Sequence, residues 1–170
     1  ISKPAQGITQ KAYMVHDHQK IELTKDILKG KQLDHVLIFC STKKSVKELT
    51  RSLNKAGLPA KDIHSDLEQN EREKVLLDFK NKNVKMLVAT DILSRGIDIK
   101  GIELVINFEV PNDAEDYVHR IGRTARADRK GEAITYINAQ QCRKFKQIED
   151  LIEKTIEKTP LPPNYEPAPN

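Results

Sequence analysis

Short runs of apolar, β-branched residues alternate with longer amphipathic stretches along most of this 170-residue chain. Strands that are covered by helices on both faces read as continuous apolar runs, and this alternation is typical of a parallel α/β sheet. Six strands are expected: Ala12–His16, Val36–Cys40, Ala60–His64, Val84–Ala89, Leu104–Phe108 and Ala133–Ile137. The pattern therefore predicts the α/β fold class with a mostly parallel central sheet.

Three helices are predicted from apolar residues that recur at spacings of three and four. Their apolar stripes are Val46, Leu49, Leu53 and Ala56; Val75, Leu76 and Phe79; and Phe145, Ile148, Ile152 and Ile156. Ser41 or Thr42 is placed to cap the first helix, and Gly57 is placed to end it. Asp66 is expected to contribute to the cap of the second helix, and the third closes the domain.

The length of the chain suits one domain with a genuine core, which we assign to residues 1–158. The last eleven residues, Pro160–Asn170, hold five prolines and little apolar content. Such a composition favours an extended linker or tail that leaves the domain without packing, here residues 159–170. No apolar run approaches the length of a membrane span, and the default compartment is cytoplasmic.

The formal net charge of +4 is compatible with binding a phosphate backbone, although many ordinary proteins are as basic. Aromatic residues make up only 5%, with no tryptophan, which argues against a base-stacking platform. Any RNA would be held mainly by sugar and phosphate. Cys40 and Cys142 lack the spacing of metal ligands, so two buried or half-buried free thiols and no metal site are expected.

The strongest chemical signal is the segment His-Arg-Ile-Gly-Arg-Thr-Ala-Arg at residues 119–126. On a turn of helix, Arg123 and Arg126 would lie about 5–6 Å apart and could fork onto phosphate oxygens. A bare pair of this spacing is more often an exposed helix end that makes surface ion pairs. The histidine, glycine and further arginine in the same eight residues favour phosphate binding. The segment resembles the HRIGRTGR motif of DEAD-box RNA helicases, with Ala125 in place of the commoner glycine.

Three further segments resemble motifs of the same family and occur in the family's order. Residues 89–99, Ala-Thr-Asp-Ile-Leu-Ser-Arg-Gly-Ile-Asp-Ile, are similar to ATDxxxRGxD. Residues 64–79 are similar to HGD…QxxR…F, with Ser65 in place of the usual glycine. Residues 36–42 are similar to VLIFxxT. Together with the flanking elements, the resemblance covers nearly the whole domain.

The resemblance implies the C-terminal, RecA-like half of a DEAD-box ATP-dependent RNA helicase, with a three-layer α/β/α sandwich. The arginine fingers for ATP hydrolysis would be Arg123 and Arg126. Gly96 and Asp98 would join them in binding the nucleotide, on its ribose side. The RNA-binding residues would be Ser41, Thr42, Ser65, Arg72 and Thr90. Interdomain coupling would fall to His119 and Arg95. The exit at Thr159–Pro163 hints at the bacterial RhlE-like subgroup.

Neither a GxxxxGK[ST] loop nor an Asp-Glu-Ala-Asp box occurs in these 170 residues. The resemblance therefore implies that ATP with Mg²⁺ is held mainly by an N-terminal RecA-like domain absent from this chain. That domain would act in cis, and the fragment alone is expected to be monomeric and inactive. RNA would be bound through its backbone, with little sequence specificity.

Two other classes of function remain open at this stage. A non-catalytic RecA-like module could serve as an RNA-binding or protein-docking adaptor, but it would have no use for intact arginines and Asp98. The corresponding domain of a DNA translocase shares a GRxxR-like ending but seldom the complete HRIGRT context. Comparing the stimulation of the full-length protein by single-stranded RNA and by single-stranded DNA would separate the DNA translocase from the RNA helicase.

Overall fold

The structure is a computed structural model that describes residues 7–91, 99, 101–122 and 131–170. The strands are β1 (Ile8–Met14), β2 (Val36–Phe39), β3 (Lys61–Ile63), β4 (Met86–Ala89), β5 (Leu104–Asn107), β6 (Gly131–Ile137) and β7 (Glu157–Lys158). The α-helices are α1 (Lys20–Lys29), α2 (Lys43–Lys55), α3 (Gln69–Lys80), α4 (Ala114–Ile121) and α5 (Cys142–Ile152), and a 3₁₀ helix, η1, spans Asp17–Gln19. All six expected strands are present with shifted bounds, whereas β7 was not expected.

The strands form one sheet in the order β3-β4-β2-β5-β6-β1-β7, and every pairing among the described strands is parallel. The central strand β2 pairs with β4 through Phe39↔Ala89 and with β5 through Phe39↔Asn107. Because all the strands point the same way, the loops that follow β2, β3, β4 and β5 meet at one edge. The predicted parallel sheet is confirmed.

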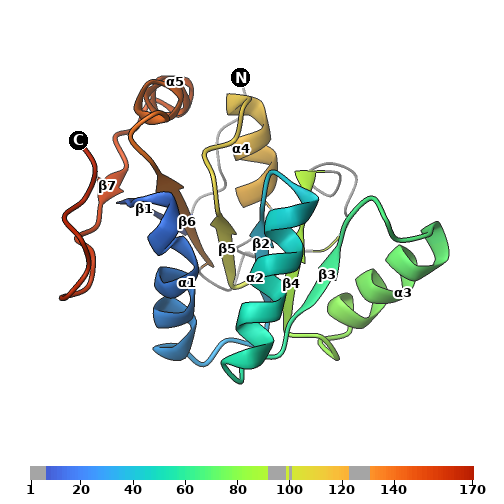
Figure 1. Ribbon diagram of the computed structural model, residues 1–170. Coiled ribbons are helices and arrows are strands. Elements are labelled where there is room, and N and C mark those ends of the chain that lie inside the picture. The colour runs from blue at the N-terminus through green and yellow to red at the C-terminus, as the bar shows by residue number, and fades with distance from the viewer. Residues whose placement is uncertain (1–6, 92–98, 100, 123–130) are drawn as a thin grey trace.

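Helices cover both faces of the sheet, which gives three layers (Figure 1). The helices α1 and α2 pack on one face, where they share a buried cluster with β2, β4, β5 and β6. On the opposite face, α4 and α5 pack over β1 and β6, and Phe79 of α3 packs over β2, β3 and β4. The RecA-like sandwich is confirmed. None of the helices that the structure describes is long and apolar enough to cross a membrane.

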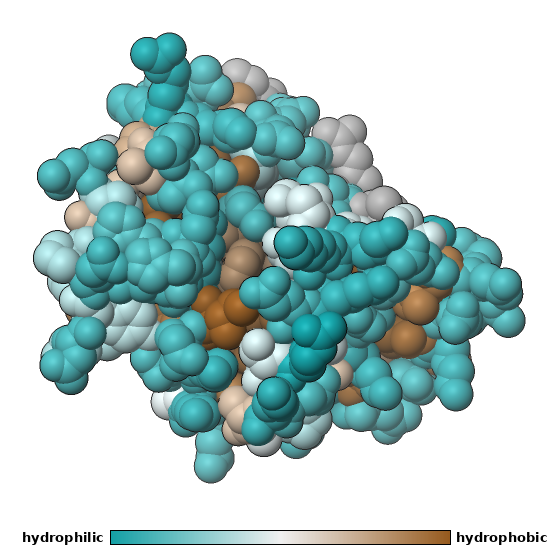
Figure 2. Space-filling model, in the orientation of Figure 1, coloured by the Kyte–Doolittle hydropathy of each residue, from teal (hydrophilic) through white to brown (hydrophobic). Residues whose placement is uncertain are grey.

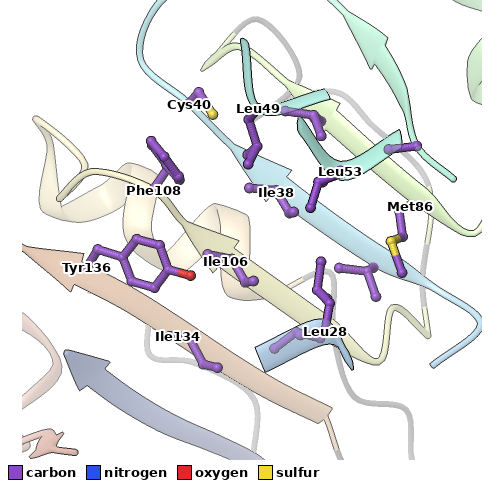
Figure 3. Close-up of a cluster of buried hydrophobic side chains, with 14 of the residues drawn as sticks. Leu28, Ile38, Cys40, Leu49, Leu53, Met86, Ile106, Phe108, Ile134 and Tyr136 are labelled. Carbon is purple, nitrogen blue, oxygen red and sulfur yellow. The ribbon is translucent and has the colours of Figure 1, made fainter. Parts of the chain in front are cut away.

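The middle strands are buried along their whole length, which explains their continuous apolar runs. Successive side chains point to opposite faces, so Ile38 joins the cluster under α1 and α2 while Leu37 joins the one under α3. Figure 3 shows the first cluster, where Leu49 and Leu53 of α2 lie against the strands. This packing fixes where α2 begins at the edge of the sheet.

The caps of α2 follow the sequence prediction, and those of α3 do not. The Thr42 hydroxyl accepts a hydrogen bond from the Ser45 N–H at 3.1 Å, as an N-cap does. For α3 the cap is Glu68, whose backbone N–H donates to the Glu71 carboxylate in a capping box. The expectation that Asp66 helps to cap α3 is wrong, because its carboxylate is bound by two lysines instead.

The third predicted helix ends one turn earlier than expected. Helix α5 stops at Ile152, where Glu153 adopts the left-handed conformation with φ 56°. Ile156 is buried, as its hydrophobicity predicts, but it lies outside the helix. The Glu149 carboxylate accepts hydrogen bonds from the Ile156 N–H at 2.8 Å and from the Lys158 ammonium at 2.6 Å. These contacts direct the chain into β7.

The C-terminal segment packs against the domain, so the expectation that it leaves the surface unpacked is wrong. It contains neither helix nor strand, yet Leu161 and Tyr165 lie against the core cluster under α1 and α2. The Tyr165 hydroxyl donates to Asp26 of α1 at 2.5 Å, and His16 contacts the Pro167 carbonyl oxygen at 2.9 Å. Apolar residues between the prolines therefore hold the segment along α1.

The two cysteines differ in exposure. Cys40 is buried at the end of β2, and burial raises the pKa of its thiol well above 9.0. Cys142 at the start of α5 is exposed, so the expectation that both thiols are at least half-buried is wrong for it. Both cysteines are free.

Candidate nucleic-acid and nucleotide interface

Polar residues follow the carboxyl ends of four neighbouring strands. We call this surface the carboxyl edge; it comprises Ser41 after β2, Ser65 after β3, Thr90 and Asp91 after β4, and Glu109 after β5. Open α/β sheets bind ligands outside the carboxyl ends of their strands. The predicted RNA-binding residues Ser65, Thr90 and Ser41 therefore follow adjacent strands, in the order β3, β4, β2, where this topology forms a binding surface.

Ser41 and Thr42 begin the loop between β2 and α2, and both are exposed. The Ser41 backbone N–H donates to the Glu109 carboxylate at 2.8 Å, which ties the end of β2 to the end of β5. The Thr42 hydroxyl is occupied as the N-cap acceptor of α2. The position of this loop is therefore set by Glu109 on one side and by the start of α2 on the other.

Ser65 is exposed beside Asp66, whose carboxylate accepts from the ammonium groups of Lys43 and Lys47, both at 2.9 Å. These two hydrogen bonds lower the pKa of Asp66 to about 2, so it is ionised at neutral pH. Arg72, in the first turn of α3, is half-buried, and its Nε donates to the Leu67 carbonyl at 3.2 Å. This leaves Arg72 anchored on the loop that carries Ser65.

Thr90 continues β4, and its backbone N–H donates to the Ile63 carbonyl at 3.3 Å. Its hydroxyl oxygen is buried and has no hydrogen-bond partner among the described residues. A buried hydroxyl without a hydrogen-bond partner lowers the stability of the fold by about 1–3 kcal/mol. A hydrogen bond to a ligand, or a local rearrangement, would remove this cost. Contact between this hydroxyl and RNA stays a prediction.

Arg120 of α4, for which no role was predicted, is buried at the carboxyl edge. Its guanidinium pairs with Asp91 at 2.5 Å, donates to the Asn107 side chain at 3.1 Å and lies 4.9 Å from the centroid of the Phe39 ring. Burial lowers the pKa of the Arg120 guanidinium, and the negative charge of Asp91 opposes this shift. A guanidinium nonetheless remains charged, so this buried cation needs the carboxylate. An arginine within a basic run gives no sequence signal that it points inward.

No role was predicted from the sequence for Glu109 either. Glu109 lines two small cavities. One, of about 180 Å³, is lined by Ser41, Asp91, Glu109, Val110, Pro111, Asn112, Arg120 and Gln141. The other, of about 280 Å³, is lined by Asp17, Lys20, Ile21, Ser45, Glu48, Phe108, Glu109 and Asn138. Burial raises the pKa of Glu109, and its hydrogen bond from Ser41 opposes that rise.

Five of the predicted site residues lie outside the described residues: Arg95, Gly96, Asp98, Arg123 and Arg126. The structure does place the residues that precede them. Asp91 comes directly before the first segment, and Arg120 lies three positions before Arg123. Because Asp91 and Arg120 are paired, the two segments start from adjacent points of the carboxyl edge. His119, next to Arg120 on α4, is half-buried.

Comparison with known proteins agrees with this arrangement. Residues 19–128 match the family described as the helicase conserved C-terminal domain. The ATP-dependent RNA helicase DbpA of Bacillus subtilis is 41% identical over 162 residues, which is 95% of this chain and 34% of that protein. The chain thus spans about a third of this relative's length.

Two solved structures are similar in fold and sequence. A DEAD box protein from the hyperthermophile Methanococcus jannaschii superposes with a TM-score of 0.83 at 42% identity, over 91% of this chain and 42% of that one. S. cerevisiae Dbp5 bound to RNA and ADP BeF3 superposes with a TM-score of 0.84 at 27% identity, over 92% of this chain and 42% of that one. The chain belongs to the family of helicase conserved C-terminal domains, and its resemblance to DEAD-box RNA helicases is confirmed.

Proposed function

We propose that this chain works as the C-terminal half of an ATP-dependent DEAD-box RNA helicase, which supplies arginine fingers and part of the RNA-binding surface. The observation that carries the proposal is the ion pair between Arg120 and Asp91. It joins the starting points of the two segments that hold Gly96, Asp98, Arg123 and Arg126. Residues that act on one nucleotide must be brought to one place, and the pairing of Asp91 with Arg120, which precede the two segments, supports such an arrangement.

On the nucleotide side, ATP with Mg²⁺ would be bound mainly by an N-terminal RecA-like domain in cis, which supplies the phosphate-binding loop that this chain lacks. Arg123 and Arg126 would then contact the γ-phosphate and stabilise the charge that develops during phosphoryl transfer. Arginine fingers of this kind account for about 10³–10⁵-fold in rate in GTPases. Gly96 and Asp98 would face the ribose, and His119 and Arg95 would couple closure of the two domains to RNA binding.

On the RNA side, the carboxyl edge would hold successive phosphates and a 2′-hydroxyl. The exposed loops at Ser41, Thr42 and Ser65 offer backbone and hydroxyl donors, and Arg72 offers a cation. Thr90 would join them. Recognition of the 2′-hydroxyl favours RNA over DNA. A strand bent on this surface cannot stay paired, so a few base pairs would be lost locally, with a monomeric protein in the cytoplasm as the working unit.

The finger assignment is tested by steady-state ATPase assays on the full-length protein with Arg123→Ala and Arg126→Ala. RNA-stimulated turnover should be lost while ATP binding is largely retained, because the triphosphate is held by the other domain. Arg143→Ala, an exposed arginine on α5, is the matched control and should behave like the wild type. Turnover that survives both substitutions would show the assignment to be wrong.

The RNA assignment is tested separately with Arg72→Ala. This change should raise the RNA concentration that gives half-maximal ATPase stimulation, without lowering the maximal rate. Lys74→Ala, two positions along α3 and exposed, removes the same charge from a different face of the helix. Equal effects of the two substitutions would mean that Arg72 contributes only general charge.

A further inference from the structure

A ridge of basic side chains runs along the outer face of α2. The α2 ridge comprises Lys43, Lys47, Arg51 and Lys55, which are all exposed and follow one another at intervals of four. Residues four apart are neighbours on a helix, and each interval advances about 6 Å, so the ridge is about 18 Å long. Figure 2 views the molecule from the side of α1 and α2, and the surface over α2 is largely hydrophilic.

The α2 ridge is electrostatically unfavourable in the absence of a partner. Like charges four positions apart destabilise a helix by about 0.2–0.5 kcal/mol per pair, and the ridge has three consecutive pairs. Asp66 neutralises only its first half, through Lys43 and Lys47. Neither Arg51 nor Lys55 has an ion-pair partner among the residues that the structure describes. The second half of the ridge therefore presents two uncompensated cations.

An ordinary solvated helix face does not account for this composition. In α3 the charged residues balance: Glu71, Glu73 and Asp78 against Arg72, Lys74 and Lys80. In α2 five basic residues, Lys43, Lys44, Lys47, Arg51 and Lys55, face a single acidic one, Glu48. The exposed face of α5 contains the compensating pair Lys146–Asp150, with 3.0 Å between the charged atoms. Among the described helices, the excess of positive charge is thus largest in α2.

The position of the ridge indicates its partner. Helix α2 begins at the carboxyl edge, with Thr42 as its N-cap, and Lys43 follows at once. The ridge is therefore continuous with the surface that holds RNA in the proposed function. No apolar residue interrupts it to anchor a protein partner: the neighbouring exposed positions are Lys44, Glu48 and Asn54. A phosphate backbone supplies repeated negative charge without an apolar anchor.

We propose that the α2 ridge binds the sugar-phosphate backbone of RNA that extends beyond the strand held at the carboxyl edge. The inference rests on the proposed function and adds to it a second phosphate-binding surface. RNA phosphates replace Asp66 as the partner of Lys43 and Lys47, and later phosphates pair with Arg51 and Lys55. Contacts of this kind read no bases, so the ridge lengthens the RNA footprint without adding sequence specificity.

The test is the double substitution Arg51→Gln with Lys55→Gln in the full-length protein. RNA affinity is measured at several salt concentrations for two single strands: one just long enough to saturate the carboxyl edge, and one extended at either end. The salt slope is the decrease of the logarithm of affinity with the logarithm of salt concentration. The loss of two phosphate contacts should reduce this slope for the extended strand by about 1.4. At 0.1 M salt, this corresponds to a loss of up to about 25-fold in affinity. The short strand should bind as it does to the wild type.

The matched control is Arg143→Gln with Lys146→Gln, which removes two exposed charges from α5 and should leave both strands unaffected. Thermal stability of the α2 variant should be unchanged or higher, because like-charge repulsion is removed. If the α2 variant bound the extended strand with wild-type affinity and salt slope, the proposal would be overturned. An equal loss of affinity in the α5 control would also overturn it. Polyglutamate serves as a probe for acidic proteins. If the α2 variant lost binding to polyglutamate but kept wild-type RNA binding, the ridge would be a site for an acidic protein instead. A wild-type protein that bound neither strand would refute the proposed function itself.

Discussion

Arg120 and Asp91 form an ion pair that is buried at one end and open at the other. The Arg120 side chain is 4% exposed, whereas the Asp91 side chain is 45% exposed. The pair joins α4 to the end of β4, and the Asn107 side chain that accepts from Arg120 itself donates to Thr135 of β6. Removal of Asp91 therefore leaves a buried charge without its partner, whereas removal of Arg120 leaves a charge that water can reach.

Asp91→Ala should destabilise the fold more than Arg120→Met. Without Asp91 a guanidinium that cannot lose its proton stays buried, which costs about 3 kcal/mol, the lower end of the range for a broken buried pair. Without Arg120 the carboxylate can still be hydrated, and the apolar methionine fills the space beside Phe39. That change should cost about 1–2 kcal/mol, mainly for the Asn107 oxygen that loses its donor.

Urea denaturation of both variants measures this difference. Asp116→Ala, which removes a carboxylate from the first turn of α4, controls for loss of negative charge near Arg120. An equal or reversed order of the two main variants would mean that Arg120 is not held by Asp91 in solution. The double variant should recover part of the loss, because the buried cation is removed together with its partner.

The main features of the fold could be predicted from the sequence because they rest on local patterns. The run at residues 36–40 is apolar at every position, as a strand covered on both faces must be. The Thr42 cap follows from residue type and spacing. Helix α1 was not predicted, because Lys20 is buried where a helical stripe calls for an apolar residue; its ammonium pairs with Asp17 at 2.9 Å.

Contacts between residues far apart in the sequence could not be predicted. Strand β7 has two exposed charged residues and no alternation, and the Glu149 carboxylate sets its position. The C-terminal segment docks through Tyr165 and Asp26, which are 139 positions apart. In the candidate site, the motifs gave the loops of the carboxyl edge, but Glu109 belongs to no motif. Only the register of β2 beside β5 brings Glu109 to Ser41.

Asp66→Asn should strengthen RNA binding. Asp66 occupies Lys43 and Lys47 and is itself a negative charge at the carboxyl edge. Its pKa of about 2 means that it repels phosphate at any physiological pH. Removing the charge ends its competition with phosphate for the two lysines, so affinity should rise. The salt slope should stay close to that of the wild type, because the same lysines contact phosphate in both proteins.

Fluorescence anisotropy with labelled RNA at several salt concentrations measures both quantities. Asp34→Asn is the matched control, because Asp34 is also an exposed partner of a lysine, Lys85, but precedes β2 at the opposite edge of the sheet. The control should leave affinity nearly unchanged. Weaker RNA binding by Asp66→Asn would instead give Asp66 a direct role in positioning the lysines for phosphate.

Glu109→Gln should make stability less dependent on pH. Burial raises the pKa of Glu109 above its ordinary 4.5, so the folded protein takes up this proton more readily than the unfolded chain does. The wild type therefore gains stability from this group as pH falls through the raised pKa and lacks that gain at neutral pH. Glutamine keeps an oxygen that can accept from the Ser41 N–H and has no charge to bury.

The Tm of the variant relative to that of the wild type should accordingly rise between pH 4 and pH 7. Differential scanning calorimetry of both proteins over this range gives the comparison. Glu73→Gln, an exposed carboxylate on α3, serves as the control. Parallel Tm profiles for Glu109→Gln and the wild type would show that the Glu109 carboxylate is well solvated at the carboxyl edge.

Cys142 should react with iodoacetamide in the native protein, whereas Cys40 should not. Cys142 is exposed at the start of α5, but Cys40 is 1% exposed, and burial raises the pKa of its thiol, which suppresses the reactive thiolate. Cys40 also donates its backbone N–H to Ala89. Alkylation of Cys40 therefore requires β2 and β4 to separate, which at ordinary domain stability slows it by at least about 10³-fold.

Mass spectrometry of peptides from timed reactions gives both rates, and a Cys142→Ser variant should stay unmodified until denaturant is added. Comparable native rates at the two sites would mean that the end of β2, and with it the Ser41 loop, opens far more readily than its packing indicates.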